Sequence, residues 1–557
     1  MEHFDLSEQH AARPKADRVI LVSPASPGSK GDEGMHLGAL RIVDSVPVQL
    51  LNPQPGPLWT DVLKRSRDLS HVTEQQGAFA DFLPHIRPTD AVLVVGADVM
   101  DGTVGPEGSL ERLSFLKKAI SRGARGAIVC SFRSDVHPLI VRAMKSLSGA
   151  DIFLRDLRSL ESYFAQVGTD AEFFPDLSYF AAPSDLQNRS CDSDMAAWLA
   201  QARERGGKII GLNFSEHMFR SFSDRHNTAA RVELVKNVID EILKAIPEAC
   251  FVLVSNDNRE WDNHPSDDTY QKFSAEILKE RIGEDRFKIH DSSSSYFDNI
   301  VLMKFLDLLI TGRMHLAHAA VRRGTVPLIM MGCECGYTSM DKMRGMYETV
   351  LGTEAGVVSE VGALSATISW AQEKMPYLKE RLEEWIETTR FEEEALKPML
   401  VRSLGLSGEP ASGKEMSAVS ARRRDVEARL ALKPREAADA KASYSPTDIQ
   451  YLHEDLGVLR STAEKVTIEA DRLVDTLLRS YRRPWEPLQW AFQREFLKLI
   501  LIFRPLLSKR AADRLQRSIQ KRDPAVYLSR WTEFKEDIGD LAGLSTDTSS
   551  DSKCEKV

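Results

Sequence analysis

Cysteine is scarce in this sequence. Six cysteines occur in 557 residues, which is too few for a disulfide framework in a chain of this length. Cys333 and Cys335 form a close pair, but no second pair accompanies them, so the pattern does not predict a zinc site. We therefore expect reduced thiols, a cytoplasmic location, and no bound metal or other cofactor.

Long apolar runs and a basic excess are also missing. No run approaches the roughly 20 apolar residues that span a bilayer, and the N-terminal segment Met-Glu-His-Phe-Asp is polar and acidic, unlike a signal peptide. The formal net charge is −9, which argues against nucleic acid as the main partner. The hydrophobic content of 42% is typical of a globular protein, and the length predicts about two to four domains.

What is present is a repeated alternation of short apolar runs with helical patterns. Short runs of this kind suit parallel strands covered on both faces, and their alternation with helices implies a parallel sheet. The runs predict strands at Arg18–Ser23, Pro47–Leu51, Ala91–Val95 and Ala127–Cys130, then at Lys208–Leu212, Phe251–Ser255, Phe287–His290, Leu308–Thr311 and Val326–Met330. A long helix from Trp370 to about Ala395 is expected to pack back across both halves. The predicted fold class is α/β, with two Rossmann-like units in a GT-B-like arrangement.

The segment after the strand Leu308–Thr311 carries the strongest functional signal. Arg313, Met314 and His315 lie at the carboxyl end of that strand and in the first turn of a helix, where open α/β sheets bind ligands. The free N–H groups and the helix dipole favour an anion there. Arg313 adds a charged fork suited to phosphate or carboxylate, and His315 adds a group that moves a proton near neutral pH.

A glycine-rich turn follows the first predicted strand. In Gly28-Ser-Lys-Gly31-Asp32-Glu33 the backbone amides are free to approach a ligand, and the helix is expected from about Gly34. An ordinary tight βα loop explains the same residues equally well. The turn is too short for a P-loop, and no Gly-x-Ser-x-Gly nucleophile motif is present.

Two further clusters have simple structural explanations. His315 and His318 are three residues apart on one helix, but no carboxylate lies between them, so we expect His318 to serve packing rather than a metal. The acidic residues that follow the strand Phe251–Ser255 are expected to be solvated: Asp257, Asp262, Asp267 and Asp268.

Several of these segments resemble the polysaccharide pyruvyl transferase family. The pattern Arg-x-His, a small-residue helix and Gly-x-Pro is matched by Gly312-Arg-Met-His315 and Gly324-Thr-Val-Pro327. Weaker matches are Gly28–Glu33, with Ser29 in place of an asparagine, Asp151–Ser162, Phe173–Ser178, and the residues Tyr337, Lys342 and Gly345. One segment departs from the family, because Gly96-Ala97-Asp98 stands where three glycines are usual. The resemblance covers about residues 18–360.

This resemblance implies transfer of a pyruvyl group from phosphoenolpyruvate to sugar hydroxyls, on a free sugar or a lipid-linked oligosaccharide. Such chemistry needs a general acid for the donor's methylene carbon, which suits His315, and groups that orient or deprotonate the acceptor, which suits Asp32 and Glu33. The remaining candidates hold the substrates: Arg313, Met314, Lys342, Asn213, Arg220, Gly31 and Tyr337. Asp156 and Ser159 are expected to cap a helix.

Two other functions fit the same residues. A GT-B glycosyltransferase would hold the diphosphate of a nucleotide sugar at the same anion site. A catalytically degenerate relative would act as a scaffold in polysaccharide assembly, and the altered Gly96-Ala97-Asp98 segment keeps this alternative open. Binding of phosphoenolpyruvate, of a nucleotide sugar, or of neither would separate the three.

The rest of the chain is divided by composition. We expect a loose leader at residues 1–16, units at 17–185 and 186–402, a linker at 403–444, a coiled coil at 445–480, a basic amphipathic helical tail at 481–540 and disorder at 541–557. The coiled coil rests on a heptad seam from Ile449 to Leu477 and predicts a homo-oligomer; a long amphipathic helix packed on the same chain is the alternative. The tail surrounds the apolar run Phe496–Phe503 with basic residues, which suits either peripheral contact with the inner face of a membrane or a small helical bundle.

Overall fold

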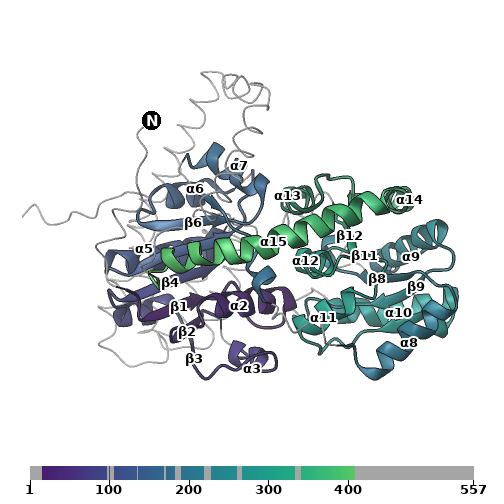
Figure 1. Ribbon diagram of the computed structural model, residues 1–557, viewed down its shortest axis with the longest axis horizontal. Helices are drawn as coiled ribbons and strands as arrows, with labels where there is room; N and C mark the ends of the chain where they lie inside the picture. The colour runs from purple at the N-terminus through teal and green to yellow at the C-terminus, as the bar shows by residue number, and fades with distance from the viewer. Residues whose placement is uncertain are drawn as a thin grey trace, which may run out of the picture. The chain divides into compact units, whose positions relative to one another are not determined.

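The computed structural model describes residues 15–54, 56–96, 100, 106–134, 136–168, 171–181, 190–218, 228–259, 266–332 and 340–407. Within them the chain builds two separate parallel sheets joined to flanking helices (Figure 1). The predicted coiled coil, the basic tail and the 541–557 segment lie outside the described residues, as do residues 1–14 of the leader and 408–444 of the linker.

The first sheet has seven strands, all paired in parallel. They are β1 (Arg18–Val22), β2 (Val48–Asn52), β3 (Val72–Gln76), β4 (Asp90–Val95), β5 (Arg125–Cys130), β6 (Ala150–Leu154) and β7 (Glu172–Phe173). Their order in the sheet is β3-β2-β1-β4-β5-β6-β7. The four strands predicted in this half are confirmed within two residues. β3 was not predicted, because its sequence Val-Thr-Glu-Gln-Gln is polar and it lies at the sheet edge, half-buried.

The second sheet has six strands, again all parallel. They are β8 (Ile209–Asn213), β9 (Cys250–Leu253), β10 (Phe287–Ile289), β11 (Leu308–Thr311), β12 (Val326–Met330) and β13 (Val357–Val358). Their order is β10-β9-β8-β11-β12-β13. β8, β9, β11 and β12 are buried along their whole length, as expected for strands covered by helices on both faces. The α/β class with two Rossmann-like units in a GT-B-like arrangement is therefore confirmed.

Helices connect the strands of each unit. In the first unit they are α2 (Lys30–Ile42), α3 (Trp59–Leu63), α4 (Phe79–Phe82), α5 (Pro106–Ser121), α6 (Pro138–Lys145) and α7 (Leu157–Gln166), with 3₁₀ turns η1 (Leu83–His85) and η3 (Leu177–Phe180). In the second they are α8 (Ser193–Glu204), α9 (Thr228–Ala245), α10 (Asp267–Ile282), α11 (Tyr296–Met303), α12 (Met314–Arg322) and α13 (Met340–Leu351), with η5 (Glu216–Met218), η7 (Glu284–Arg286) and η8 (Val361–Ala363). Asp156 caps α7 by accepting from the amide and hydroxyl of Ser159, as predicted.

The return helix is longer than expected and is broken near its start. α14 (Leu364–Glu373) ends at the residue before Lys374, and α15 (Met375–Ser403) begins directly after it. Pro376 explains the break, because proline lacks the N–H that would continue α14 but fits the first turn of a new helix. α15 packs on α12, α13 and α14 of the second unit and on α2 and β5 of the first (Figure 1). The expected crossing of both units is confirmed, and the helix continues to Ser403, into the segment assigned to the linker.

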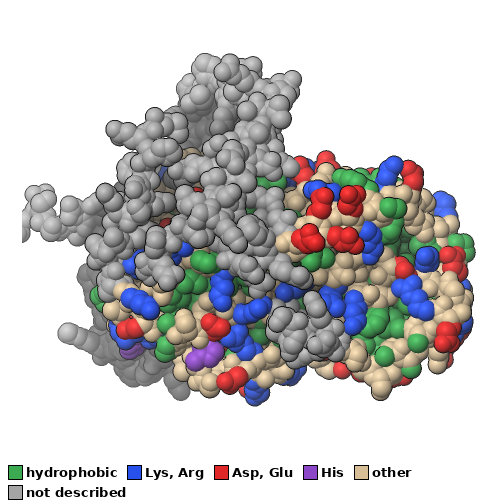
Figure 2. All heavy atoms as spheres, in the orientation of Figure 1, with side chains coloured by type: hydrophobic (Ala, Val, Ile, Leu, Met, Phe, Trp, Pro, Cys, Tyr) green, Lys and Arg blue, Asp and Glu red, His purple; other side chains and the backbone are tan. Residues whose placement is uncertain are grey.

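The described surface is mixed in charge. Figure 2 shows lysine and arginine side chains interspersed with aspartate and glutamate side chains, and apolar side chains distributed between them. Among the described residues, no helix has both the length and the apolar content to cross a bilayer.

Candidate functional site

The strand order locates the ligand-binding edge of each sheet. The order reverses between β1 and β4 in the first sheet and between β8 and β11 in the second, and open α/β sheets bind ligands at such points, beyond the carboxyl ends of the strands. α2 follows β1, α12 follows β11, and these two helices pack against each other. The glycine-rich turn and the Arg-x-His segment therefore meet, although about 280 residues separate them in the sequence.

α2 begins four residues earlier than the sequence suggested. The Ser29 hydroxyl accepts a hydrogen bond from the Asp32 amide at 3.2 Å and caps the helix, as serine commonly does. Gly31, Asp32 and Glu33 consequently lie in the first turn of α2, buried, rather than in a loop. The backbone here is tied to the second unit, because the Lys30 amide donates to the carbonyl of Asn256 at 2.8 Å.

His315 is held between the two units. A Cβ placed on Gly31 would lie 2.3 Å from His315 Nδ1, so the ring fits against α2 only because residue 31 is glycine. On its other side, Nε2 lies 3.4 Å from Oδ2 of Asp176, and the side chain is 12% exposed. Arg155 donates to the same carboxylate oxygen at 2.7 Å. Burial acts to raise the pKa of Asp176, but His315 and Arg155 hold it well below its usual range. A permanent carboxylate thus lies beside the imidazole, at a distance where it stabilises the protonated ring.

His318 also faces Asp176, from inside the protein. Its Nδ1 lies 3.8 Å from Asp176 Oδ1, its ring packs on Tyr179, and burial lowers its pKa to about 3. Asp176, His315 and His318 present ligand atoms within 4.8 Å of one another, a spacing that could hold a metal ion. The guanidinium of Arg155 already neutralises the carboxylate, however, and a second cation there would be repelled. The arrangement fits an oriented histidine better than a metal site.

Arg313 is engaged in a buried network. Its guanidinium donates to Asp267 Oδ1 at 2.7 Å and contacts His217 Nε2 at 2.8 Å. Asp267 accepts in turn from the side chain of Asn213 at 2.9 Å, and the Asn213 oxygen accepts from Thr311. Asn213 is fully buried, and both ends of its amide are used within this network. Arg313 remains a candidate for binding substrate, but carboxylates already contact much of its guanidinium group.

The acidic segment is buried rather than solvated. Asp257 and Asp267 are 7% and 0% exposed, which corrects the prediction of a solvated loop for these two residues. Arg259 explains how burial is tolerated, because its guanidinium binds Asp257 at 2.6 Å and reaches Asp32 of the first unit at 3.3 Å. Burial acts to raise the pKa of Asp257, but Arg259 holds it below its usual value. Asp32 is therefore part of a bridge between the units.

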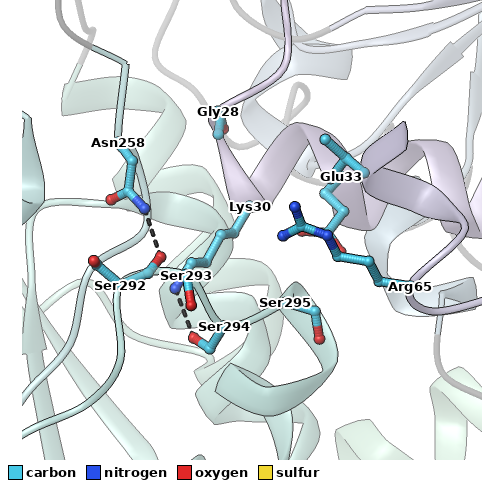
Figure 3. A pocket seen from close by; sticks show the side chains of 11 residues that line it. Gly28, Lys30, Glu33, Arg65, Asn258, Ser292, Ser293, Ser294 and Ser295 are labelled. Atoms are coloured by element: carbon cyan, nitrogen blue, oxygen red, sulfur yellow. Dashed lines mark hydrogen bonds between the residues drawn. The ribbon is translucent and has the colours of Figure 1, made fainter. Parts of the chain in front are cut away.

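A cavity of about 130 Å³ opens beside the first turn of α2. Its walls come from both units, as Figure 3 shows, and are formed by Gly28, Ser29, Lys30, Glu33, Val62, Arg65, Asn258 and Ser292 to Ser295. Lys30 Nζ donates to the hydroxyl of Ser294 at 2.8 Å, and burial lowers its pKa to about 8. Glu33 Oε2 accepts from the Tyr296 amide at 3.2 Å, and burial raises the pKa of Glu33 to about 7.

The other predicted residues are only partly described. Lys342 is buried in the first turn of α13, and its charge acts on His318. Gly345 allows α13 to approach α7, because a Cβ there would lie 2.4 Å from Asp156 Oδ1. Met314 is buried at the start of α12. Arg220, Tyr337, Ala97 and Asp98 lie outside the described residues.

Four features of the site are not evident from motifs in the sequence. They are Lys30, Asp176, Arg65 and the serines at 292–295. A run of four serines after Asp291 and before the apolar pattern of α11 is a helix-start signal, and it was the available clue.

The sequence matches no family model, and no curated protein matches it. Among solved structures, Glycyrrhiza uralensis UGT73P12 complexed with glycyrrhetinic acid 3-O-monoglucuronide is similar over 77% of this chain and 100% of its own, with 10% identity and a TM-score of 0.44. A UDP-glucosyltransferase from Polygonum tinctorium is similar over 75% of this chain and 99% of its own, with 12% identity and a TM-score of 0.44. A Thermobaculum terrenum O-GlcNAc transferase mutant is similar over 75% of this chain and 68% of its own, with 13% identity and a TM-score of 0.37. At these values the comparisons assign no activity, and the fold rests on the strand order and register.

Proposed function

We propose that this protein is a transferase that moves the pyruvyl group of phosphoenolpyruvate to hydroxyls of a sugar acceptor. The observation that carries the proposal is His315, held by Asp176 against the first turn of α2 at the junction of two ligand-binding sheet edges. An oriented imidazole is suited to general acid catalysis. The Arg-x-His segment that contains it is also the most specific part of the resemblance to the polysaccharide pyruvyl transferase family.

The reaction assigns a step to each group. His315 gives a proton to the methylene carbon of phosphoenolpyruvate, which becomes a methyl group and leaves the neighbouring carbon electron-poor. A first sugar hydroxyl adds to that carbon, a second hydroxyl displaces phosphate, and both hydroxyl protons pass to bases or water. The products are a cyclic ketal and inorganic phosphate. Glu33, whose pKa is raised by burial to about 7, is suited to accept one of these protons.

A second candidate is glycosyl transfer from a nucleotide sugar. The GT-B-like arrangement of the two units favours it, because that architecture places two ligand-binding sheet edges against each other. The anion site predicted at Arg313 and the start of α12 would then bind the diphosphate of the nucleotide sugar. The cavity of about 130 Å³ is small beside the usual 300–1,000 Å³ of ligand sites, and this favours the smaller donor.

The test compares donors directly. The purified full-length protein is incubated with phosphoenolpyruvate and a panel of glycans, and released phosphate is measured; a parallel series with nucleotide sugars measures released nucleotide. We expect acceptor-dependent phosphate release and a glycan mass increase of one pyruvyl ketal. Release of nucleotide instead would establish the second candidate. If calorimetry detects binding of neither donor, the scaffold role is the function that remains.

A further inference from the structure

The cavity beside α2 holds an ammonium group whose hydrogen-bond partners are hydroxyl groups, although the Glu33 carboxyl lies in the same wall. Lys30 is 4% exposed, and its side chain donates to two neutral hydroxyls, Ser294 at 2.8 Å and Ser255 at 3.4 Å. Within the described ranges no carboxylate forms an ion pair with it. An ammonium has three donors, so at least one N–H is available to a ligand. A charge buried in this way is costly unless an anion joins it.

Other donors converge on the same space. The guanidinium of Arg65 is directed toward Lys30 and Glu33 (Figure 3), and in the described part of the chain it forms no ion pair. α2 and α11 both begin at the cavity, capped by Ser29 and Ser295, so the positive ends of two helix dipoles face it. Two cations, serine hydroxyls and two helix starts together form a site for a compact anion with several oxygen atoms.

We propose that this cavity binds the phosphoryl group of an organic phosphate, and that binding is coupled to uptake of a proton by Glu33. The anion site follows from the geometry alone, whereas its assignment to phosphoenolpyruvate rests on the proposed function. Phosphate formed in the reaction would leave from the same cavity.

The coupling follows from the position of Glu33 in the cavity wall. Burial raises the pKa of Glu33 to about 7, and the groups that face it are Lys30 on its own helix, Arg65 after α3, and the Tyr296 amide and Asp298 on α11. A dianion adds negative charge to this wall and favours the neutral carboxyl. The anion therefore binds more tightly at a pH where Glu33 is already protonated, and its affinity falls as the pH rises through about 7.

Sulfate is the probe, because its own charge is constant near neutral pH. Calorimetric titration of the full-length protein at constant ionic strength is compared at pH 6 and pH 7.5. If the bound anion makes Glu33 tenfold less acidic, affinity falls about threefold across this interval. Glu33→Gln should remove the part of the fall that comes from Glu33 and leave only the smaller part that comes from Lys30, whose pKa is lowered by burial to about 8. An equal pH dependence in wild type and Glu33→Gln overturns the coupling.

Substitutions in the wall locate the binding. Lys30→Met keeps the length of the side chain and should weaken sulfate binding about 10- to 100-fold, because it removes a charged hydrogen-bond donor. Arg65→Gln, an exposed change with little risk to folding, should weaken it about threefold. The neighbouring Lys64→Gln is the matched control and should have no effect, because Lys64 is exposed and paired with Asp61. Absence of sulfate binding, or binding that neither cavity variant changes, overturns the proposal.

Competition separates this inference from the proposed function. Displacement of sulfate by phosphoenolpyruvate supports both, whereas displacement by a nucleoside diphosphate alone supports the cavity and moves the donor to a nucleotide sugar. If neither displaces sulfate, the cavity is an anion site and its assignment to a donor is wrong. Lys30→Met and Arg65→Gln are also assayed for acceptor-dependent phosphate release. If the release is unchanged in both variants, the proposed function stands, but the cavity is not the donor site.

Discussion

His315 is fixed by contacts on two sides. Gly31 allows the ring to lie against α2, and Asp176 holds the opposite nitrogen. Replacement of His315 by glutamine keeps a polar side chain but removes the imidazole proton that the proposed step transfers. Because general acid catalysis contributes about 10² to 10⁴ in rate, kcat for phosphate release should fall by that factor while donor affinity changes little.

The matched control is His85→Gln, which makes the same chemical change at an exposed histidine of η1. It should leave the rate unchanged. Steady-state kinetics with both variants checks the prediction, and full activity in His315→Gln would remove the general acid role from this residue.

Glu33 should also leave a signature in the pH dependence of stability. Its pKa is raised by burial to about 7 from an ordinary value of 4.5, so between these two pH values the folded state holds a proton that the unfolded state has released. Rising pH therefore favours unfolding in this interval. The free energy of unfolding should fall by up to about 3 kcal/mol relative to that of Glu33→Gln, and the difference should level off above about pH 7.5. Urea unfolding of both proteins from pH 4.5 to 8 measures it; parallel curves would contradict it.

The positions and the burial of single residues were only partly predictable from the sequence. The placement of His315 and Glu33 in one region followed from the rule that ligands bind at the carboxyl ends of parallel strands. The burial of Asn213 and Asp267 did not follow, because a polar residue is buried only when a partner from elsewhere in the fold satisfies it. That partner is Arg313 for Asp267, 46 residues away, and residue spacing alone does not reveal such a pair.

At the scale of elements, apolar runs predicted the strands correctly, whereas polar segments did not reveal the strand or helix start that they form. β11 and β12 have the bounds that the sequence predicted, because a buried parallel strand must be apolar along its length. β3 was missed because an edge strand has one unpaired side and fewer apolar neighbours. The start of α2 was set by the Ser29 cap rather than by the glycines, which suggested a loop.

The cap of α7 provides a test at this scale. Asp156 accepts from the Ser159 amide at 2.8 Å and its hydroxyl at 2.6 Å, so Asp156→Ala should lower the free energy of unfolding by about 1–2 kcal/mol. Asp156→Asn should retain most of the stability, since asparagine is an equally good cap. Urea midpoints at pH 7 distinguish them. Equal losses in the two variants would show that the negative charge of Asp156, rather than its cap, is what stabilises the helix.

At the scale of the whole molecule, α15 joins the two units. Its buried leucines include Leu378, Leu382, Leu400 and Leu404, each 0% exposed. A chain that stops after Lys374 loses all of them and uncovers the surfaces that they pack against. We expect it to be poorly soluble and to lose cooperative unfolding, because burying one such side chain contributes about 1.5–3 kcal/mol.

A chain that stops after Ser407 is the control for this truncation. It keeps every residue of α15, and its urea midpoint should be close to that of the full-length protein. Size-exclusion chromatography and urea unfolding of the two shortened proteins test the role of the helix. A stable, monodisperse 1–374 protein would show that the units hold together without it.

The end of α15 returns to the beginning of the chain. The Ala16 amide donates to the carbonyl of Gly405 at 2.9 Å, and Gly405, at φ +66°, lies so close to Arg125 of β5 that a Cβ would be 2.1 Å from the guanidinium. During synthesis, about 230 residues separate the last strand of the first sheet at Phe173 from the end of the helix at Ser403. At about 5–20 residues per second, a ribosome needs roughly 10–50 seconds to supply that helix. The first sheet must therefore wait, with part of its apolar surface uncovered, for a helix that is made well after its own last strand.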